Sequence, residues 1–191
     1  MLDMVPDMFP TEHDPDNADC TFLEPACGHG NFLVEILDRK LKYVTPRRYR
    51  RGERFEHRVL RCLASIYGID ISDDNVEESR ARIASLIGAH VESQLGGDGP
   101  SISFIDAVDA ILETNIIRAD TLADHSDIEL VEYKPGTGGT FTREWSRLDP
   151  AENEPNLFSL SPRQDEVPIH YSELRDNPGP VVLGAVETKL A

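Results

Sequence analysis

Residues 22–33 read FLEPACGHGNFL, and the chain around them has a simple local pattern. The apolar residues of Asp19–Pro25 predict a buried strand, and Asn31–Leu41 repeats apolar residues at helical spacing. Gly28 and Gly30 lie between the two, where glycine permits a tight turn and a close approach of the backbone to a ligand. The N-terminus of the following helix points toward the same place. The segment therefore predicts a strand, a glycine turn and a helix.

The chain that follows continues to alternate strands and helices. Further helices are expected over about 54–65, 73–87 and 104–113, and buried strands over 65–70 and 114–118. Ser72 is a suitable N-cap for the second of these helices, Gly88 is placed to end it, and His90–Ser103 is expected to form a loop. The order β-α-α-β-α-α-β predicts an α/β fold with a mainly parallel sheet flanked by helices.

The pattern changes after residue 127. Ile128–Lys134 and Thr140–Trp145, joined by a glycine-rich turn at 135–139, predict a C-terminal β-hairpin that adds antiparallel strands to the sheet. Its aromatic residues are expected to fill a core rather than stack on a base. Residues 148–168 are predicted to be extended or poorly ordered, and 180–186 to form one last strand. We thus divide the chain into a domain over 1–147 and an irregular extension over 148–191.

The charge is distributed unevenly. The formal net charge is −16, which argues against a protein that binds DNA without a partner. Ten of the nineteen basic residues nevertheless lie within Arg39–Arg61, with only two glutamates among them. This basic stretch has three interpretations: a DNA contact, a docking site for an acidic partner, or a solvated surface.

Other sequence features exclude several classes of protein. No apolar run approaches the roughly 20 residues that span a bilayer, and we expect a cytoplasmic protein without membrane contact. The three cysteines have no CxxC or Cys/His spacing, so we predict reduced thiols and no metal site.

Acidic residues follow the second and third predicted strands. Asp70 ends a buried strand, where a carboxylate can accept hydrogen bonds from ribose hydroxyls. Asp120 follows the next strand, where it can accept the exocyclic amino group of adenine. Because parallel strands end at one edge of the sheet, these aspartates and the glycine turn are predicted to converge on one nucleoside.

The same residues carry a specific resemblance. Leu23–Leu33 (LEPACGHGNFL) resembles the (D/E)PACGxGxFL motif of N6-adenine DNA methyltransferases of restriction–modification systems. Tyr67–Ile71 with the following Asp74-Asn75-Val76 is similar to that family's second motif, and 115–117 with 120–122 to its third. The resemblance covers roughly residues 19–125.

This resemblance implies a Rossmann-like methyltransferase fold that binds S-adenosyl-L-methionine. It implies that Glu24 contacts the amino end of the methionine, that Asp70 holds the ribose and that Asp120 reads the adenine, while Gly28 and Gly30 shape the loop. Cys27, although at a helix N-terminus where a thiol pKa can fall, is implied to line the loop. The candidate cofactor-binding residues are Glu24, Pro25, Ala26, Cys27, Gly28, Gly30, Asn31, Phe32, Asp70, Ile71, Asp120 and Thr121.

The sequence also departs from the family pattern. Glu24 replaces the commoner aspartate, and His29 replaces a small residue. The (D/N/S)PP(Y/F) tetrapeptide that holds the flipped base is not found, and Asn177–Pro180 (NPGP) does not substitute for it. The catalytic residues are therefore unassigned, and the fold is expected to be truncated relative to the family. Three hypotheses remain. The first is a methyltransferase, whole or split with a complementary methyltransferase or restriction subunit, and the second is an inactive cofactor-binding accessory or anti-restriction protein. The third is an acidic protein that mimics DNA phosphates and inhibits a nucleic-acid enzyme.

Overall fold

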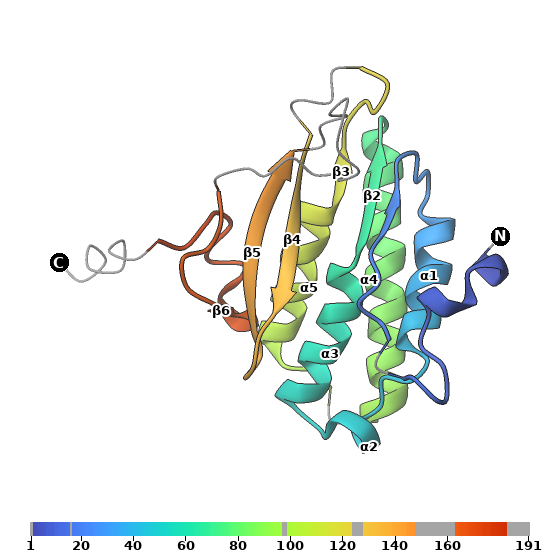
Figure 1. Ribbon diagram of the computed structural model, residues 1–191, viewed down its shortest axis with the longest axis vertical. Coiled ribbons are helices and arrows are strands. Elements are labelled where there is room, and N and C mark those ends of the chain that lie inside the picture. The colour runs from blue at the N-terminus through green and yellow to red at the C-terminus, as the bar shows by residue number, and fades with distance from the viewer. Residues whose placement is uncertain (1, 16, 97–98, 124–127, 148–162, 183–191) are drawn as a thin grey trace.

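The computed structural model describes residues 2–15, 17–96, 99–123, 128–147 and 163–182. Figure 1 shows two sheets with helices packed around them. The first part runs η1 (Leu2–Met4), η2 (Pro6–Met8), β1 (Phe22–Glu24), α1 (Asn31–Leu41), α2 (Pro46–Tyr49), α3 (Glu53–Ala64), β2 (Ile66–Asp70), α4 (Asp73–Leu95), α5 (Ile102–Asn115) and β3 (Ile116–Arg118). The second part runs β4 (Glu129–Pro135), β5 (Thr140–Arg147), β6 (Ile169–His170) and η4 (Tyr171–Glu173).

The first sheet contains three parallel strands in the order β1-β2-β3. Glu24 is opposite Gly68 in β2, and Asp70 is opposite Arg118 in β3. Every residue of β2 is buried, as expected for the central strand of a parallel sheet that is covered on both faces. The predicted order of strands and helices is confirmed except for the short helix α2, which was not predicted, and the C-terminal ends of all three strands lie at one edge of the sheet.

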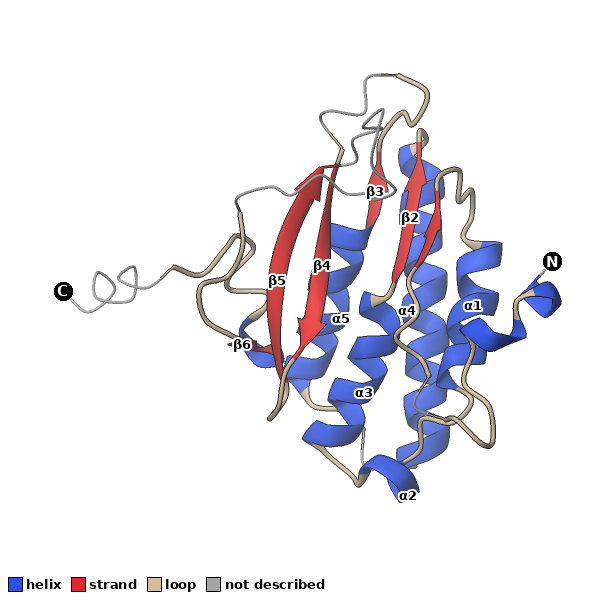
Figure 2. Ribbon diagram, viewed as in Figure 1, coloured by secondary structure: helices blue, strands red, loops and turns tan. Residues whose placement is uncertain are grey.

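The two faces of this sheet are covered by different elements. A side chain at Gly68 would collide with Leu33 of α1, so this face of β2 packs against α1. The neighbouring Tyr67 points to the other face, where its hydroxyl donates to the Val131 carbonyl of β4 at 3.0 Å. The hairpin thus lies on the face opposite α1, as Figure 2 shows for the two groups of strands.

The hairpin is confirmed, but its place in the sheet was predicted wrongly. Strands β4, β5 and β6 form a separate antiparallel sheet and do not extend the parallel one. Phe141 and Trp145 of β5 are buried, which confirms that they fill a core. Burial of this apolar face against α3, α5 and Tyr67 accounts for the separate layer, because hydrophobic faces of two layers stabilise each other by contact.

Helix α4 is longer than the sequence predicted. It continues through Gly88 to Leu95 and ends at Gly96, so the expected loop over 90–103 is wrong for residues 90–95, and also for 102 and 103, where α5 begins. Val91 and Leu95 are buried and continue the apolar stripe of the helix by another two turns. This burial outweighs the cost of about 1 kcal/mol for one glycine inside a helix.

The C-terminal segment that the structure describes is packed through a buried ion pair. Asp165 accepts two hydrogen bonds from the Arg143 guanidinium, at 2.9 and 3.0 Å, and both side chains are almost fully buried. Arg143 also donates to the carbonyls of Asn177 and Gly179, at 2.6 and 2.9 Å. Most of the predicted irregular segment and residues 183–186 of the predicted last strand lie outside the described residues, and 180–182 are not a strand.

His57 joins α3 to the hairpin. Its ring packs edge-on against Phe141 with centroids 4.7 Å apart, and its Nε2 lies 3.1 Å from the Thr140 carbonyl, which can only accept. Nε2 therefore carries the proton. Burial, followed by the nearby positive charge of Arg61, lowers the pKa of His57 to about 4.

We expect His57 to make folding sensitive to mild acid. Between pH 6.5 and about 4 the unfolded chain binds a proton that the folded chain does not, so stability falls as pH falls. The loss from this group is at most about 3 kcal/mol. Urea unfolding of wild type and His57→Gln, at pH 7 and pH 4.5, measures it; the variant retains an N–H donor and should lose less. The exposed His13→Gln serves as control, and an unchanged pH slope in His57→Gln would contradict the assignment.

Candidate functional site

The ends of the three parallel strands are tied together by hydrogen bonds. The Gly28 N–H, in the loop after β1, donates to Asp70 Oδ2 at 2.8 Å. The Ala119 N–H, after β3, donates to the Asp70 carbonyl at 3.0 Å, and Thr121 Oγ1 donates to the Pro25 carbonyl at 3.2 Å. The structure thus brings together the three segments that the sequence assigned to one site, and we call this region the strand-end edge (residues 24–32, 70–72 and 119–122).

The two glycines of the loop have different surroundings. Both have the left-handed backbone that disfavours other residues, with φ +52° at Gly28 and +73° at Gly30. A Cβ at Gly30 would lie 2.3 Å from Ser79 Oγ of α4, so Gly30 permits close packing of the loop on that helix. A Cβ at Gly28 would meet nothing within 4 Å. Gly28 therefore borders open space.

The start of α1 also faces this edge. Helix α1 begins at Asn31, and no side chain caps its N-terminus. The first amide groups of a helix lack partners within the helix and are suited to a carboxylate or another anion. Glu24, the last residue of β1, is half-buried, and Phe32 packs partly against the core. The loop thus presents amide donors beside one carboxylate.

Asp70 has a larger role in the fold than the sequence indicated. Its carboxylate accepts from the N–H groups of Gly28 and Ser72 and from Asn75 Nδ2, all between 2.8 and 2.9 Å. These hydrogen bonds, that from Ser72 first, lower the pKa of Asp70 below its usual value. A carboxylate has about four acceptor positions, so about one remains for a ligand. Asp70 can then accept from one ribose hydroxyl, rather than from both.

The side chains after β2 and β3 are more open. Asp120 is exposed, and its Oδ1 accepts from the Leu122 N–H at 2.9 Å, which leaves the other oxygen unoccupied by described residues. Ile71 and Leu122 expose 63% and 95% of their surface, although both are large apolar residues. Ile71 directly follows Asp70 in the chain, and Leu122 lies two residues after Asp120, so this apolar surface belongs to the strand-end edge. The exposure of Leu122 was not foreseen from the sequence.

Cys27 and His29 of the loop have different surroundings. Burial, followed by the negative charge of Asp70, raises the pKa of the Cys27 thiol to about 11. The thiol therefore stays protonated near neutral pH, which agrees with a residue that lines the loop rather than attacks a substrate. His29 is exposed, with Nε2 at 3.7 Å from Glu78 Oε2, and lies on the outside of the loop.

Sequence reasoning gave no structural role to three residues of α4 that hold the loop in place, although Asn75 belongs to the stretch that resembles the family's second motif. Arg82 Nη1 donates to the His29 carbonyl at 2.6 Å and to Asn31 Oδ1 at 2.7 Å. Asn75 supports Asp70, and Ser79 packs beneath Gly30. The polar character of these residues on a predicted helix gave no signal, because a polar residue on a helix is most often simply solvated.

The chain was compared with protein-family models, curated proteins and solved structures, and nothing matches it. Four cavities lined by described residues lie elsewhere in the molecule, away from the strand-end edge. No cluster of His, Cys, Asp or Glu in the described part of the chain is arranged to hold a metal ion. No helix within the described ranges has the length and apolar character to cross a membrane.

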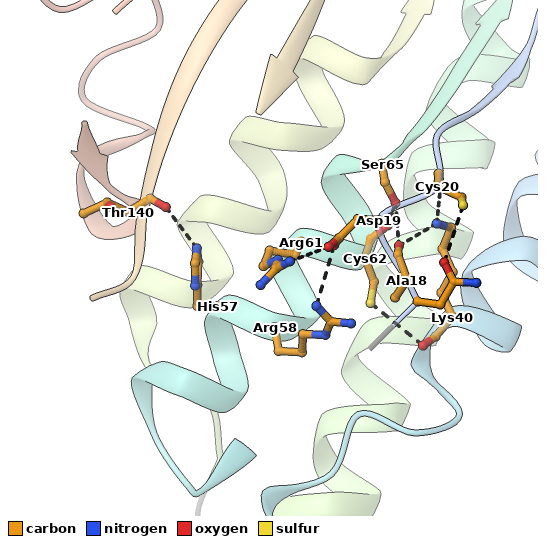
Figure 3. Close-up of polar contacts among 11 residues, drawn as sticks. Ala18, Asp19, Cys20, Lys40, His57, Arg58, Arg61, Cys62, Ser65 and Thr140 are labelled. Carbon is orange, nitrogen blue, oxygen red and sulfur yellow. Dashed lines mark hydrogen bonds and ion pairs between the residues drawn. The ribbon is translucent and has the colours of Figure 1, made fainter. Parts of the chain in front are cut away.

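The basic stretch divides into two parts, of which one is used inside the fold. Figure 3 shows Lys40 Nζ between the Ala18 and Cys20 carbonyls, at 2.7 and 2.6 Å. Burial lowers the pKa of Lys40 to about 8. Asp19 pairs with Arg61 and lies 3.6 Å from the buried Arg58. These basic residues fasten the segment before β1 to α1 and α3, and the arginines of α2 and the start of α3 are exposed.

Proposed function

We propose that the chain binds S-adenosyl-L-methionine at the strand-end edge and functions as an adenine-N6 DNA methyltransferase-like protein with a Rossmann-like fold. The observation that carries this proposal is the hydrogen bond between the Gly28 N–H and Asp70, two residues 42 positions apart. It joins the glycine loop to the acidic strand end, which is the arrangement that a nucleoside pocket requires.

The chemistry of the edge suits this cofactor. S-adenosyl-L-methionine carries an ammonium and a sulfonium, and Glu24, Asp70 and Asp120 provide carboxylates at all three strand ends. The free amides at the start of α1 suit the methionine carboxylate, and Ile71 offers an apolar contact to the adenine. When bound, the cofactor supplies an electrophilic methyl group.

The missing tetrapeptide favours an enzyme of two chains, in which this chain binds the cofactor and a second chain holds the target base. Among the described residues β1 pairs with β2 alone, so its outer edge is open to a further strand. We propose that a complementary methyltransferase or restriction subunit in the cytoplasm supplies the base-holding residues and DNA contacts. The second candidate is an inactive accessory or anti-restriction protein, which the same missing tetrapeptide favours.

Titration calorimetry with S-adenosyl-L-methionine tests the proposed cofactor site. We expect binding of one molecule per chain, and about a tenfold loss in Asp70→Ala, because hydrogen bonds to a charged group contribute roughly 1.5–3 kcal/mol. Since Asp70 also supports the loop, the exposed Asp120→Asn is the second variant, and it should weaken binding without loss of stability. Asp38→Asn, on the exposed side of α1, is the control. Absence of heat with folded protein would overturn the proposal.

A radiolabelled methyl-transfer assay on unmethylated DNA separates the two candidates. A split enzyme transfers methyl groups only when a chain with the tetrapeptide is added, whereas an inactive accessory protein does not restore transfer with any such chain. Transfer by this chain alone would show that residues other than the tetrapeptide hold the target base.

A further inference from the structure

A cavity lined by arginines lies at the far end of the molecule from the strand-end edge. It is formed by α2, α3 and the turn between β4 and β5, and its volume is about 360 Å³. Five arginines line it: Arg48, Arg50, Arg54, Arg58 and Arg61. Figure 1 shows α2 and the start of α3 beyond the N-terminal ends of the parallel strands. We call this hollow the arginine cavity.

The positive charge of the arginine cavity is only partly neutralised. Asp19 pairs with Arg58 and Arg61, the two lining arginines that are furthest from the start of α3. Glu53 is the one carboxylate among the described lining residues, and its Oε2 lies 3.7 Å from His170 Nε2. The remaining three arginines, Arg48, Arg50 and Arg54, are exposed and form no ion pair with a described residue.

This gathering of exposed arginines is unusual for so acidic a chain. With 35 acidic and 19 basic residues, a surface arginine readily finds a carboxylate. Arg39, Arg118 and Arg175 each do so elsewhere on the surface. Arginines that line one cavity without forming ion pairs can instead bind an anion from solution.

The backbone at the cavity is also strained. Arg50 is the one non-glycine residue with positive φ in the described ranges, with φ +63° and ψ +164°. This region is populated almost only by glycine, and side chains held there cost of order 1–3 kcal/mol. Arg50 ends α2 and lines the cavity.

We propose that the arginine cavity is a phosphate-binding site. The planar guanidinium presents paired N–H donors that match phosphate oxygens, and several arginines around one hollow favour phosphate over a single carboxylate. The phosphate belongs either to a nucleic-acid backbone or to a soluble polyphosphate. The site is separate from the cofactor site, because β2 alone, about 16 Å long, lies between the two ends of the sheet. The proposal therefore does not depend on the cofactor assignment.

Binding of two probes to the full chain tests the site. The probes are sodium pyrophosphate, followed by calorimetry, and a fluorescein-labelled 12-nucleotide DNA strand, followed by anisotropy. We expect Arg48→Gln/Arg54→Gln to weaken binding about tenfold or more, since charge-assisted hydrogen bonds are lost. For the DNA strand, the slope of log affinity against log salt should become less steep by roughly 1.4. Arg175→Gln removes the same kind of charge elsewhere and should bind normally.

Arg50→Gly is a second variant, which should change binding affinity and thermal stability in opposite directions. Glycine removes both the guanidinium and the backbone strain, so binding should weaken while the melting temperature rises by a few degrees. A variant that merely damaged the fold would lower both.

The outcomes are distinct. If pyrophosphate displaces the DNA strand, the ligand is a nucleic-acid backbone; if pyrophosphate binds and the DNA strand does not, it is a soluble polyphosphate. The proposal is overturned if neither probe binds, or if Arg48→Gln/Arg54→Gln binds as tightly as wild type. Asp70→Ala should leave both affinities unchanged, so failure here and failure of the cofactor proposal are separate results.

Discussion

Asp165→Ala is expected to lower the free energy of unfolding by about 3–5 kcal/mol, the usual cost of leaving one partner of a buried ion pair alone. The variant strands the Arg143 guanidinium, which is 2% exposed. It also removes the acceptor of two backbone N–H groups, those of Arg143 and Val181, at 2.8 and 2.9 Å. Urea unfolding measures the loss, and a change below 1 kcal/mol would contradict the assigned role of the pair.

Two further variants separate the buried charge from the contacts. Arg143→Met/Asp165→Leu replaces both partners by apolar residues and should be less destabilised than Asp165→Ala, because no charge is left unpaired. It should remain below wild type, since the Asn177 and Gly179 carbonyls lose their donor. Arg175→Gln breaks an exposed ion pair and should cost at most about 1 kcal/mol.

Gly30→Ala is expected to destabilise the fold by more than about 2 kcal/mol. The left-handed backbone alone costs an alanine about 1–2 kcal/mol, and the added Cβ would lie 2.3 Å from Ser79 Oγ. Gly28→Ala has the same backbone cost without a neighbour within 4 Å, so its loss should be smaller. Thermal or urea unfolding of the two variants compares strain alone with strain and crowding.

Ser79 makes this prediction more stringent. Its Oγ is buried without a well-formed hydrogen bond to a described residue, and its interaction with the Cys27 thiol is weak, so Ser79→Ala alone should be close to neutral. Gly30→Ala/Ser79→Ala should then be more stable than Gly30→Ala, because the nearest atom is gone. Additive effects of the two substitutions would show that the loop moves away from α4 instead of packing on it.

Local patterns in the sequence predicted much of the fold. Asn31–Leu41 is the predicted helix residue for residue, and Ser72 caps α4 as expected, with its side chain accepting from the Asn75 N–H. The order of strands and helices follows from apolar periodicity, which acts over a few residues. The convergence of the glycine loop, Asp70 and Thr121 follows because parallel strands end at one edge.

Features that depend on distant contacts were not predictable. The extension of α4 past Gly88 depends on burial of Val91 and Leu95 against other elements. The separate hairpin sheet depends on partners such as Tyr67, 64 positions from Val131. Arg82 donates hydrogen bonds to a loop about 50 residues earlier in the chain. The periodicity and spacing of the sequence near these residues do not indicate such long-range contacts.

The hydrogen bonds that hold the glycine loop also bear on the rate and the affinity of the ligand binding that we propose. Arg82 fixes the loop from α4, and Asp70 fixes it from β2. The conformational entropy of the loop is therefore lost when the chain folds, and a ligand that arrives later need not order it again. For the cofactor that we propose, this loop would be a preformed site, in which selectivity depends on the shape of the ligand more than on adjustment of the protein.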